Sequence, residues 1–411
     1  MGTTEINQKL KRTSKEELDK ILEEYQKKCQ LYRHGRNFGM GLYPLPVALD
    51  AYLKFADTNM IYAGGTLGNP FLGVSEMEIE SIKMMSTIFN GDDAIKGNIT
   101  FGGSESNILA IKAAREKARE EGLERGKGRV IMPDSAHPSL IKACHLLDLE
   151  IIRTASTEKY EADPKIIRDN ITEDTVAIVS TCGTHTVGTI DPIEEIGRIA
   201  NDKGIWHHVD AAWGGFISCW LRMAGKYDIP KFDFEIEGVT SITVDPHKML
   251  FAPMPAGGIL YRNSDYQKHA FFDFDDELGI HGHYFTTTFA GSRTGGNMAA
   301  TYALLKHYGA EGYTELALKC MDLTYRMVEG VKDIPGLEIP IKPKMNLFAV
   351  ASETLDVNKI SDQMRDKGWY GLYTTKVPPS FRVVLLPQNE PHIEAFLKDL
   401  RSISTSSDVK L

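Results

Sequence analysis

The sequence reads Val176-Ala-Ile-Val-Ser-Thr181, then Pro192-Ile-Glu-Glu-Ile-Gly-Arg-Ile-Ala-Asn-Asp-Lys203, then Trp206-His-His-Val209. The outer segments are short runs rich in β-branched or bulky residues, which predicts strands, and the middle segment has a helical pattern of apolar residues. A strand, a helix and a second strand in this order are typical of a βαβ unit, whose strands are parallel. The stretch therefore predicts an α/β fold.

The same alternation continues on both sides of this stretch. Further strands are expected at Asn98–Phe101, Arg129–Pro133, Glu150–Arg153, Ser241–Val244 and Gly258–Tyr261. Helices are expected between them at Ser75–Asn90, Asn107–Glu121, Pro138–Leu147 and Asp163–Asn170. Because such helices cover both faces of a sheet, residues 71–296 are predicted to form a large domain around a mostly parallel sheet.

Two further parts are predicted, residues 1–70 and residues 297–411. The first is an N-terminal arm and loop segment with helices at Lys15–Leu31 and Val47–Ala56. The second is a smaller C-terminal α+β domain. Its expected elements are the helices Asn297–Tyr308, Gly312–Val331, Asn358–Lys367 and Glu390–Ser402 and the strands Leu337–Ile341, Leu347–Ala351 and Phe381–Leu386.

Composition narrows the class of protein. With 42% hydrophobic and 25% charged residues, the 411-residue chain is typical of a globular protein. A net charge of −9 without a long basic run argues against a nucleic-acid partner, and no apolar run is long enough to predict a membrane span. The five scattered cysteines fit neither a disulfide framework nor a zinc site. We therefore expect a cytoplasmic protein whose partner is a small molecule.

The strongest chemical signal is Ser241-Ile-Thr-Val-Asp-Pro-His247-Lys248. In α/β sheets ligands bind beyond the carboxyl ends of the strands, so a lysine just past such an end is placed to meet one. Lysine forms an imine only as the neutral amine, a form that burial or a neighbouring cation such as His247 favours. Taken alone, such a lysine is more often a solvated residue at a strand end than an imine-forming one.

A second signal changes that balance. Trp206-His-His-Val-Asp210-Ala-Ala-Trp-Gly-Gly215 places a carboxylate at the end of another strand, followed by small residues that let a flat ring approach. Pyridoxal phosphate needs such an anion beside its pyridine nitrogen, because the protonated ring is the electron sink. Taken by itself, an Asp after a strand is more often a helix N-cap or a turn residue.

Two weaker signals complete the set. Phe101-Gly-Gly-Ser-Glu-Ser-Asn107 precedes an Ala-rich helix, and Gly103, Ser104 and the helix N-terminus together suit a phosphate. His137 follows a strand, where an imidazole can stack on a planar cofactor, although a lone histidine is more often structural. The conjunction of lysine, carboxylate, phosphate cradle and stacking ring predicts a pyridoxal-phosphate site.

These motifs carry a resemblance to a known family. The order GGSESN, AH, CGTHTVGTID, HVDAAWGG and DPHK resembles the group II pyridoxal-phosphate-dependent decarboxylases, most of all their archaeal tyrosine/aspartate decarboxylase branch. The likeness extends from about residue 37 to residue 387. It implies a type I aminotransferase-like fold, pyridoxal 5′-phosphate as cofactor, and a homodimer with active sites at the subunit interface.

The resemblance also implies roles for individual residues. Lys248 would form the Schiff base, Asp210 would pair with the pyridine nitrogen, and His137 would stack on the ring. The cofactor phosphate would be held by Gly103, Ser104 and His247, with Ser104 standing where the family usually has Thr.

Three further positions follow from the same likeness. Thr184 would lie near the phenolic oxygen of the cofactor, and Ala212 would pack beneath its ring. Arg382, in Phe381-Arg-Val-Val, falls where the small domain commonly binds a substrate carboxylate. The implied reaction is decarboxylation of an L-amino acid with an aromatic or acidic side chain, giving an amine and carbon dioxide.

Residues 281–286 hold the candidate for the final proton transfer. The family uses a tyrosine of a mobile loop, so Tyr284 is the expected acid that protonates Cα, with His281 and His283 as rivals. This segment is equally well a Gly-containing surface turn or a clamp on the cofactor phosphate of the partner subunit. Without nearby carboxylate or thiol partners, its two histidines make a poor metal site, so no metal is expected.

Alternatives remain for the chemistry. Gly282-His-Tyr-Phe-Thr-Thr-Thr-Phe-Ala-Gly-Ser-Arg293 is similar to a stretch of sphingosine-phosphate lyases, which cleave a carbon–carbon bond to give an aldehyde. Those lyases usually carry a cation soon after the Schiff-base lysine, where this chain has Ala252-Pro-Met254. A cofactor-binding regulator without turnover is a further reading. His34, Arg36 and Arg293 are open between substrate contacts and structural roles.

Overall fold

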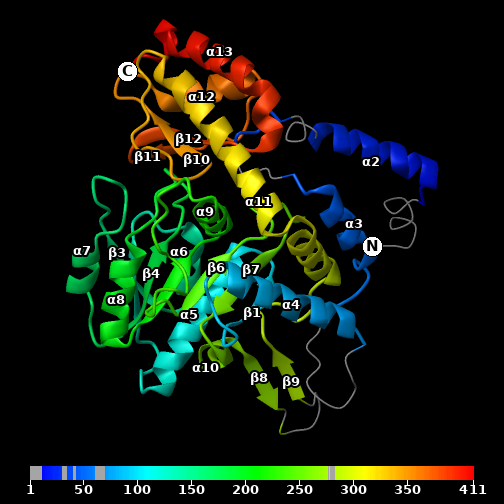
Figure 1. Ribbon diagram of the computed structural model, residues 1–411, viewed down its shortest axis with the longest axis vertical. Coiled ribbons are helices and arrows are strands. Elements are labelled where there is room, and N and C mark those ends of the chain that lie inside the picture. Colours follow the sequence, from blue (N-terminus) through cyan, green and yellow to red (C-terminus); the bar gives the residue numbers. More distant parts are fainter. Residues whose placement is uncertain (1–11, 30–34, 40–42, 61–69, 276, 278–282) are drawn as a thin grey trace, which may run out of the picture.

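The centre of the protein is a seven-stranded sheet of order β1-β7-β6-β5-β4-β2-β3 (Figure 1). The computed structural model describes residues 12–29, 35–39, 43–60, 70–275, 277 and 283–411. The strands are β1 (Lys96–Thr100), β2 (Arg129–Pro133), β3 (Glu150–Thr154), β4 (Thr175–Thr181), β5 (Trp206–Asp210), β6 (Ser241–Val244) and β7 (Gly257–Tyr261). Only β7 runs antiparallel to its neighbours β1 and β6. The expected α/β fold with a mostly parallel sheet is confirmed.

Helices bury both faces of this sheet. They are α4 (Leu72–Ile88), α5 (Gly103–Glu120), α6 (Pro138–Leu147), α7 (Pro164–Asp169), α8 (Ile193–Lys203) and α9 (Gly214–Met223). Along β4, Ile178 packs with Ile196 of α8, whereas the next residue, Val179, packs in the cluster that contains α5 and α6. Successive side chains of a strand point to opposite faces, so every residue of β4 is buried. Helix α9 was not predicted, because its first two residues are glycines.

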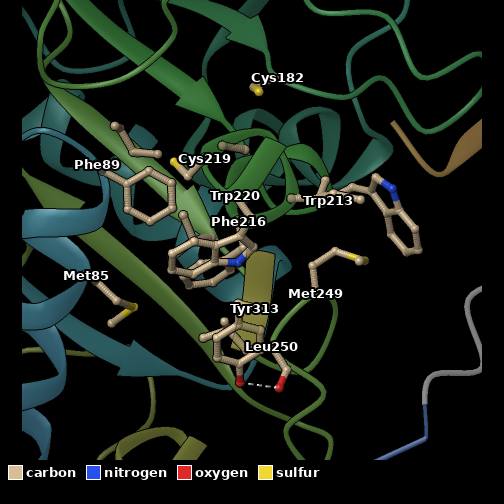
Figure 2. Close-up of a cluster of buried hydrophobic side chains, with 14 of the residues drawn as sticks. Met85, Phe89, Cys182, Trp213, Phe216, Cys219, Trp220, Met249, Leu250 and Tyr313 are labelled. Carbon is tan, nitrogen blue, oxygen red and sulfur yellow. Dashed lines mark hydrogen bonds between the residues drawn. The ribbon is translucent and has the colours of Figure 1, made fainter. Parts of the chain in front are cut away.

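A large hydrophobic cluster lies beside the segment that follows β6 (Figure 2). Trp220 of α9 stacks on Tyr313 with ring centroids 5.4 Å apart. The Tyr313 hydroxyl donates a hydrogen bond of 3.0 Å to the Leu250 carbonyl. Burial of a large side chain contributes about 2–3 kcal/mol, so this packing holds the backbone two residues beyond Lys248 firmly.

The C-terminal part contains a second sheet, of order β10-β12-β11, at the end of the molecule opposite the β8–β9 hairpin (Figure 1). Its strands and helices are β10 (Leu347–Ala351), β11 (Thr374–Lys376), β12 (Pro379–Val384), α12 (Val357–Asp366) and α13 (Ile393–Ser404). The expected strand at Leu337–Ile341 is wrong, since only Glu338 makes an isolated bridge, to Ala351. Pro340 has no N–H to continue the ladder.

The segment α11 (Gly295–Lys332) connects the two sheets and consists of two helices that meet at a kink. The two predicted helices, Asn297–Tyr308 and Gly312–Val331, are confirmed, because Gly309 between them has a non-helical backbone with φ 55°. The first part of α11 packs in the cluster of Figure 2 and its later part in the core of the small sheet. The division of the chain after residue 296 stays a prediction.

The N-terminal part reaches the C-terminal sheet. Helix α2 (Lys15–Cys29) has no buried residue, and α3 (Pro46–Lys54) packs on α11. Between them, the Phe38 N–H donates to the Tyr370 carbonyl at 2.8 Å, and Phe38 is fully buried. Two residues of the expected first helix, Gln30 and Leu31, lie outside the described residues. Among those described, no helix is both long and apolar enough to span a membrane.

A hairpin that was not predicted follows the last strand of the seven-stranded sheet in sequence. It pairs β8 (Phe272–Asp275) with β9 (His283–Thr286), and its tip lies outside the described residues. Phe272, Phe274 and Tyr284 are each between 46% and 52% exposed. The hairpin therefore presents aromatic surface that no described part of the chain covers.

Candidate active site

A cavity of about 300 Å³ opens at the carboxyl ends of the parallel strands. Segments that follow β1, β2, β4, β5 and β6 form its walls, because the carboxyl ends of parallel strands meet at one edge of a sheet. Of the residues selected from the sequence, those lining it are Gly103, Ser104, His137, Asp210, Ala212, His247 and Lys248. The fold thus brings together groups from five strand ends.

Lys248 is paired with a buried carboxylate. Its Nζ lies 2.8 Å from Oδ2 of Asp245, which is 1% exposed. The other oxygen, Oδ1, has no hydrogen-bond partner among the described residues. A buried polar atom of this kind indicates a donor supplied by a ligand or water. The pair places an amine at the cavity wall with a base beside it.

Asp210 ends β5 with its carboxylate held by two donors. Oδ1 accepts the N–H of Ala212 at 3.1 Å, and Oδ2 accepts Nδ2 of Asn107 at 3.0 Å. The residue is 5% exposed, and within the described chain no basic side chain forms an ion pair with it. Since a buried carboxylate without a cation is costly, a positively charged group of a ligand in the cavity would stabilise it.

The start of α5 forms a close-fitting rim. Gly102 has φ +105°, and a Cβ on Gly103 would lie 2.8 Å from Asp245 Oδ2. Glycines keep this turn open, and the first N–H groups of a helix are suited to bind an anion. Ser104 adds an exposed hydroxyl, and His247 is fixed beside it by a 2.6 Å hydrogen bond from Nδ1 to the Ala256 carbonyl.

His137 caps α6 and lies against a second imidazole. Its Nδ1 accepts the N–H of Ser139 at 3.2 Å, and its ring meets that of His185 edge to face at 5.2 Å. Burial lowers the pKa of His137, and burial chiefly lowers the pKa of His185 to about 4. Both rings are therefore neutral near pH 7, which suits contact with an aromatic ligand.

Three of the selected residues do not line this cavity. Thr184 is buried with its hydroxyl 2.8 Å from that of Thr189. Arg382 on β12 donates from Nη1 to the His185 carbonyl at 2.8 Å, so it supports the cavity wall through His185. Tyr284 is 49% exposed on the hairpin. Its rival His283 forms a 2.6 Å hydrogen bond with Asp273, and His281 lies outside the described residues.

The two arginines whose roles the sequence left undecided, Arg36 and Arg293, have structural partners. Arg293 is 4% exposed and forms an ion pair with Glu78, and its Nη1 donates to the Ile99 carbonyl at 2.5 Å. Arg36 donates to the Lys367 carbonyl at 2.7 Å and lies 4.0 Å from the ring centre of Trp369. Both therefore join distant segments of the chain. His34 lies outside the described residues.

The lining residues that sequence reasoning did not select include Asn107, Ser139, His185 and Asp245. Asn107, His185 and Asp245 lie inside the quoted motifs, so position within a motif was a usable signal. Nothing in the sequence marks Ser139, which enters the cavity because it follows His137 at the start of α6.

Comparison with known proteins identifies the family. Residues 69–351 match the pyridoxal-dependent decarboxylase conserved domain. The chain belongs to the pyridoxal-dependent decarboxylase family. It is 38% identical over 380 residues to a probable L-tyrosine/L-aspartate decarboxylase of Methanothermobacter thermautotrophicus, covering 90% of this chain and 98% of that one. It is 35% identical over 398 residues to the L-aspartate decarboxylase of Thermococcus kodakarensis, covering 95% and 97%.

A solved structure is also similar to this decarboxylase-family chain. The sphingosine-1-phosphate lyase of Burkholderia pseudomallei K96243 superposes with a TM-score of 0.87 at 31% identity, covering 96% of this chain and 91% of that one. The resemblance seen in the sequence, with its decarboxylase and lyase components, is therefore confirmed. The protein is a pyridoxal-phosphate-dependent carboxy-lyase of the type I fold.

The cavity fits pyridoxal phosphate. The amine of Lys248, the buried Asp210 without a cation and the glycine turn at α5 match the aldehyde, the protonated ring nitrogen and the phosphate in chemistry. Within the described residues, no group of three or more His, Cys, Asp or Glu side chains is arranged to hold a metal ion.

Proposed function

We propose that the protein decarboxylates an L-amino acid with an acidic or aromatic side chain, as a cytoplasmic homodimer. The observation that carries the proposal is the convergence of Lys248, Asp210 and the N-terminus of α5 on one cavity. The names of the relatives, L-aspartate and L-tyrosine/L-aspartate decarboxylases, support the substrate class.

Bound pyridoxal phosphate supplies an electron sink for the pair of electrons left when carbon dioxide departs. Lys248 is proposed to hold the cofactor covalently and to give way to the substrate amine. Asp210 would hold the proton of the ring nitrogen, since its carboxylate accepts two hydrogen bonds from the described residues and can accept a third. His137 would contact the ring.

The remaining roles concern the phosphate and the substrate. Gly103, Ser104 and His247 are proposed to hold the phosphate, with Ala212 beneath the ring. Arg382 is proposed to orient the substrate carboxylate, supported by its position behind His185 and by the permanent charge of a guanidinium group. Thr184 remains a candidate near the phenolic oxygen.

Tyr284 is proposed to deliver the proton to Cα in the cavity of the partner subunit. It does not line the cavity of its own chain, and it belongs to a hairpin whose aromatic side chains are about half exposed. Large exposed apolar surface is typical of an interface, so the hairpin supports a homodimer.

The four buried cysteines, Cys144, Cys182, Cys219 and Cys320, are unpaired, which supports a reducing compartment.

Carbon–carbon cleavage is the second candidate function, favoured by the TM-score of 0.87 to a sphingosine-1-phosphate lyase. A phosphorylated substrate needs a cation beyond those that hold the cofactor. Lys248 is the only lysine or arginine among the described lining residues, and Met254 and Pro255 lie where a further cation would be needed. The cavity therefore favours decarboxylation.

The deciding experiment supplies the cofactor-loaded protein with a panel of L-amino acids and with a phosphorylated long-chain amino alcohol, following carbon dioxide and aldehyde together. Carbon dioxide and an amine from an acidic or aromatic amino acid are expected. Aldehyde and phosphoethanolamine without carbon dioxide would establish the lyase instead.

A further inference from the structure

A chain of buried hydrogen bonds lies behind the cavity wall. It begins at Trp206, whose Nε1 donates to Ser241 Oγ at 2.8 Å, and Ser241 Oγ lies 2.8 Å from His208 Nδ1. His208 Nε2 lies 3.0 Å from Oδ1 of Asn107. Asn107 Nδ2 in turn contacts Asp210 Oδ2 at 3.0 Å and Ser139 Oγ at 2.9 Å. The series thus reaches both candidate cofactor contacts, Asp210 directly and His137 through Ser139.

The direction of these bonds follows from the Asp210 end. An ionised carboxylate only accepts, so the NH₂ of Asn107 must face Asp210 and its carbonyl oxygen must face His208. That oxygen also only accepts, so Nε2 of His208 carries a proton. Burial lowers the pKa of His208 to about 4, and the ring is therefore neutral with Nδ1 unprotonated.

The other end of the series is compatible with this direction. The indole N–H of Trp206 can only donate, so Ser241 Oγ accepts from it and is free to donate its own proton. Its acceptor is then Nδ1 of His208, which carries no proton when Nε2 carries one and the ring is neutral. Thr243 Oγ1, 3.3 Å from His208 Nε2, is a further acceptor for the same proton. The two ends agree.

The same direction of donation continues from Asn107 to His137. Both hydrogens of the Asn107 amide are used, one on Asp210 and one on Ser139. Ser139 Oγ accepts from Asn107 and donates to His137 Nδ1, 2.8 Å away, where the Ser139 N–H also points. Two donors facing one ring nitrogen require that nitrogen to be an acceptor.

We propose that Asn107 is a positioning residue whose amide fixes the Asp210 carboxylate and, through Ser139, holds His137 as a neutral ring with its proton on Nε2. The catalytic consequence rests on the proposed roles of Asp210 and His137 at the cofactor. A neutral His137 does not compete for the charge of Asp210, which stays available for the ring nitrogen.

Other charged groups also act on His137. Lys248 and Arg382 oppose its protonation, and Asp210 and Asp245 favour it. His185 touches the ring edge to face and is itself kept neutral chiefly by burial. These groups lie on other elements around the ring. The effect of Asn107 on the pKa of His137 therefore has to be measured in variants that leave all of them unchanged.

The first test uses the full-length, cofactor-free protein with ¹⁵N-labelled histidine. Long-range ¹H–¹⁵N spectra distinguish the two neutral tautomers from the imidazolium, and His137→Gln and His208→Gln assign the signals. We expect both residues as the Nε2–H tautomer at pH 7. An Nδ1–H tautomer or an imidazolium at His137 would overturn the proposal without any further variant.

Substitutions of Asn107 and Ser139 give the second test. Asn107→Leu keeps the size and removes the amide, and Ser139→Ala removes only the last hydroxyl. Both should let His137 protonate at higher pH than in the wild type. In the loaded enzyme, Asn107→Leu should lower kcat about 10- to 100-fold with KM little changed, and should shift the pH dependence of the cofactor's visible absorbance. An unchanged His137 titration in both folded variants would contradict the proposal.

Ser180→Ala is the matched control. Ser180 Oγ lies 2.7 Å from Nε2 of His207, the neighbour of His208 that points to the opposite face of the sheet. The substitution breaks an equally buried Ser–His hydrogen bond, and it should leave the tautomer and titration of His137 unchanged. If His137 and His208 are both found as the Nε2–H tautomer but no amino acid is decarboxylated, the inference stands and the proposed function fails.

Discussion

The carboxyl edge of β4, β5 and β6 and the β8–β9 hairpin both carry candidate catalytic groups, but in opposite surroundings. Asp210 and Asp245 at the sheet edge are 5% and 1% exposed and are held by partners of their own chain. Tyr284 on the hairpin is 49% exposed, and its ring meets that of Phe272 at 6.0 Å between centroids. The difference indicates that the edge is organised within one chain, whereas the hairpin needs a second surface.

The largest effect is expected at the sheet edge. Lys248→Ala removes the amine that is proposed to hold the cofactor, so decarboxylation should fall about 10⁴-fold. Mass spectrometry after borohydride reduction should find no cofactor on the variant. The exposed Lys226→Ala is the control and should keep both activity and cofactor. A Lys248→Ala variant with near-wild-type rates would remove this lysine from the mechanism.

Stability should separate the two regions next. Phe216→Ala opens a cavity beside Phe89, 5.3 Å away in the core of Figure 2, and should lower the free energy of unfolding by about 3–5 kcal/mol. Phe274→Ala on the hairpin should cost each protomer well under about 1 kcal/mol, because the ring is about half exposed. Denaturant unfolding compares the two. Equal losses would mean that the hairpin is as tightly packed as the core.

Tyr284→Phe should lower kcat about 100-fold by removing the proposed proton donor. Mixing this variant with Lys248→Ala sharpens the comparison. If Tyr284 acts across the interface, random mixed dimers contain one intact site and recover about a quarter of the wild-type rate. Mixed dimers with no recovered activity would place the tyrosine in its own chain's site or outside the mechanism.

The smallest expected effect is an acid sensitivity of the sheet. Burial lowers the pKa of His207 to about 3 and that of His208 to about 4, from an ordinary value of 6.5. Below about pH 6.5, the unfolded chain therefore binds protons at these two histidines that the folded chain does not bind. The stability that the neutral rings contribute is complete above pH 6.5 and is lost as the pH falls toward 4.

Thermal unfolding between pH 7.5 and 4.5 checks this. The midpoint should fall with pH in the wild type and fall less in His207→Gln, which has one buried imidazole fewer. His145→Gln, at an exposed position of α6, should behave as the wild type. An identical pH dependence in all three proteins would show that His207 does not contribute.

The sequence was most informative where local and tertiary requirements agree. The strands of the large sheet and the residues at their ends were recoverable, because β-branched runs, glycines and a chemically matched set of side chains occur in a fixed order. The strand predicted at Leu337–Ile341 is not found. A short apolar run that contains a proline matches the strand pattern, but the proline cannot donate to the ladder of hydrogen bonds. The hairpin was missed because its strands are four residues each and their alternation serves an exposed surface.

By itself the sequence determined the α/β class and the chemistry of the cavity, since periodicity and the order of motifs are local properties. Only the tertiary structure decided how that chemistry is held. Asn107 and Asp210 are 103 positions apart, and Arg293 pairs with Glu78 across 215. Such contacts depend on which strands become neighbours and on how buried polar groups satisfy one another. No local pattern records this, because the partners meet only after the sheet has formed.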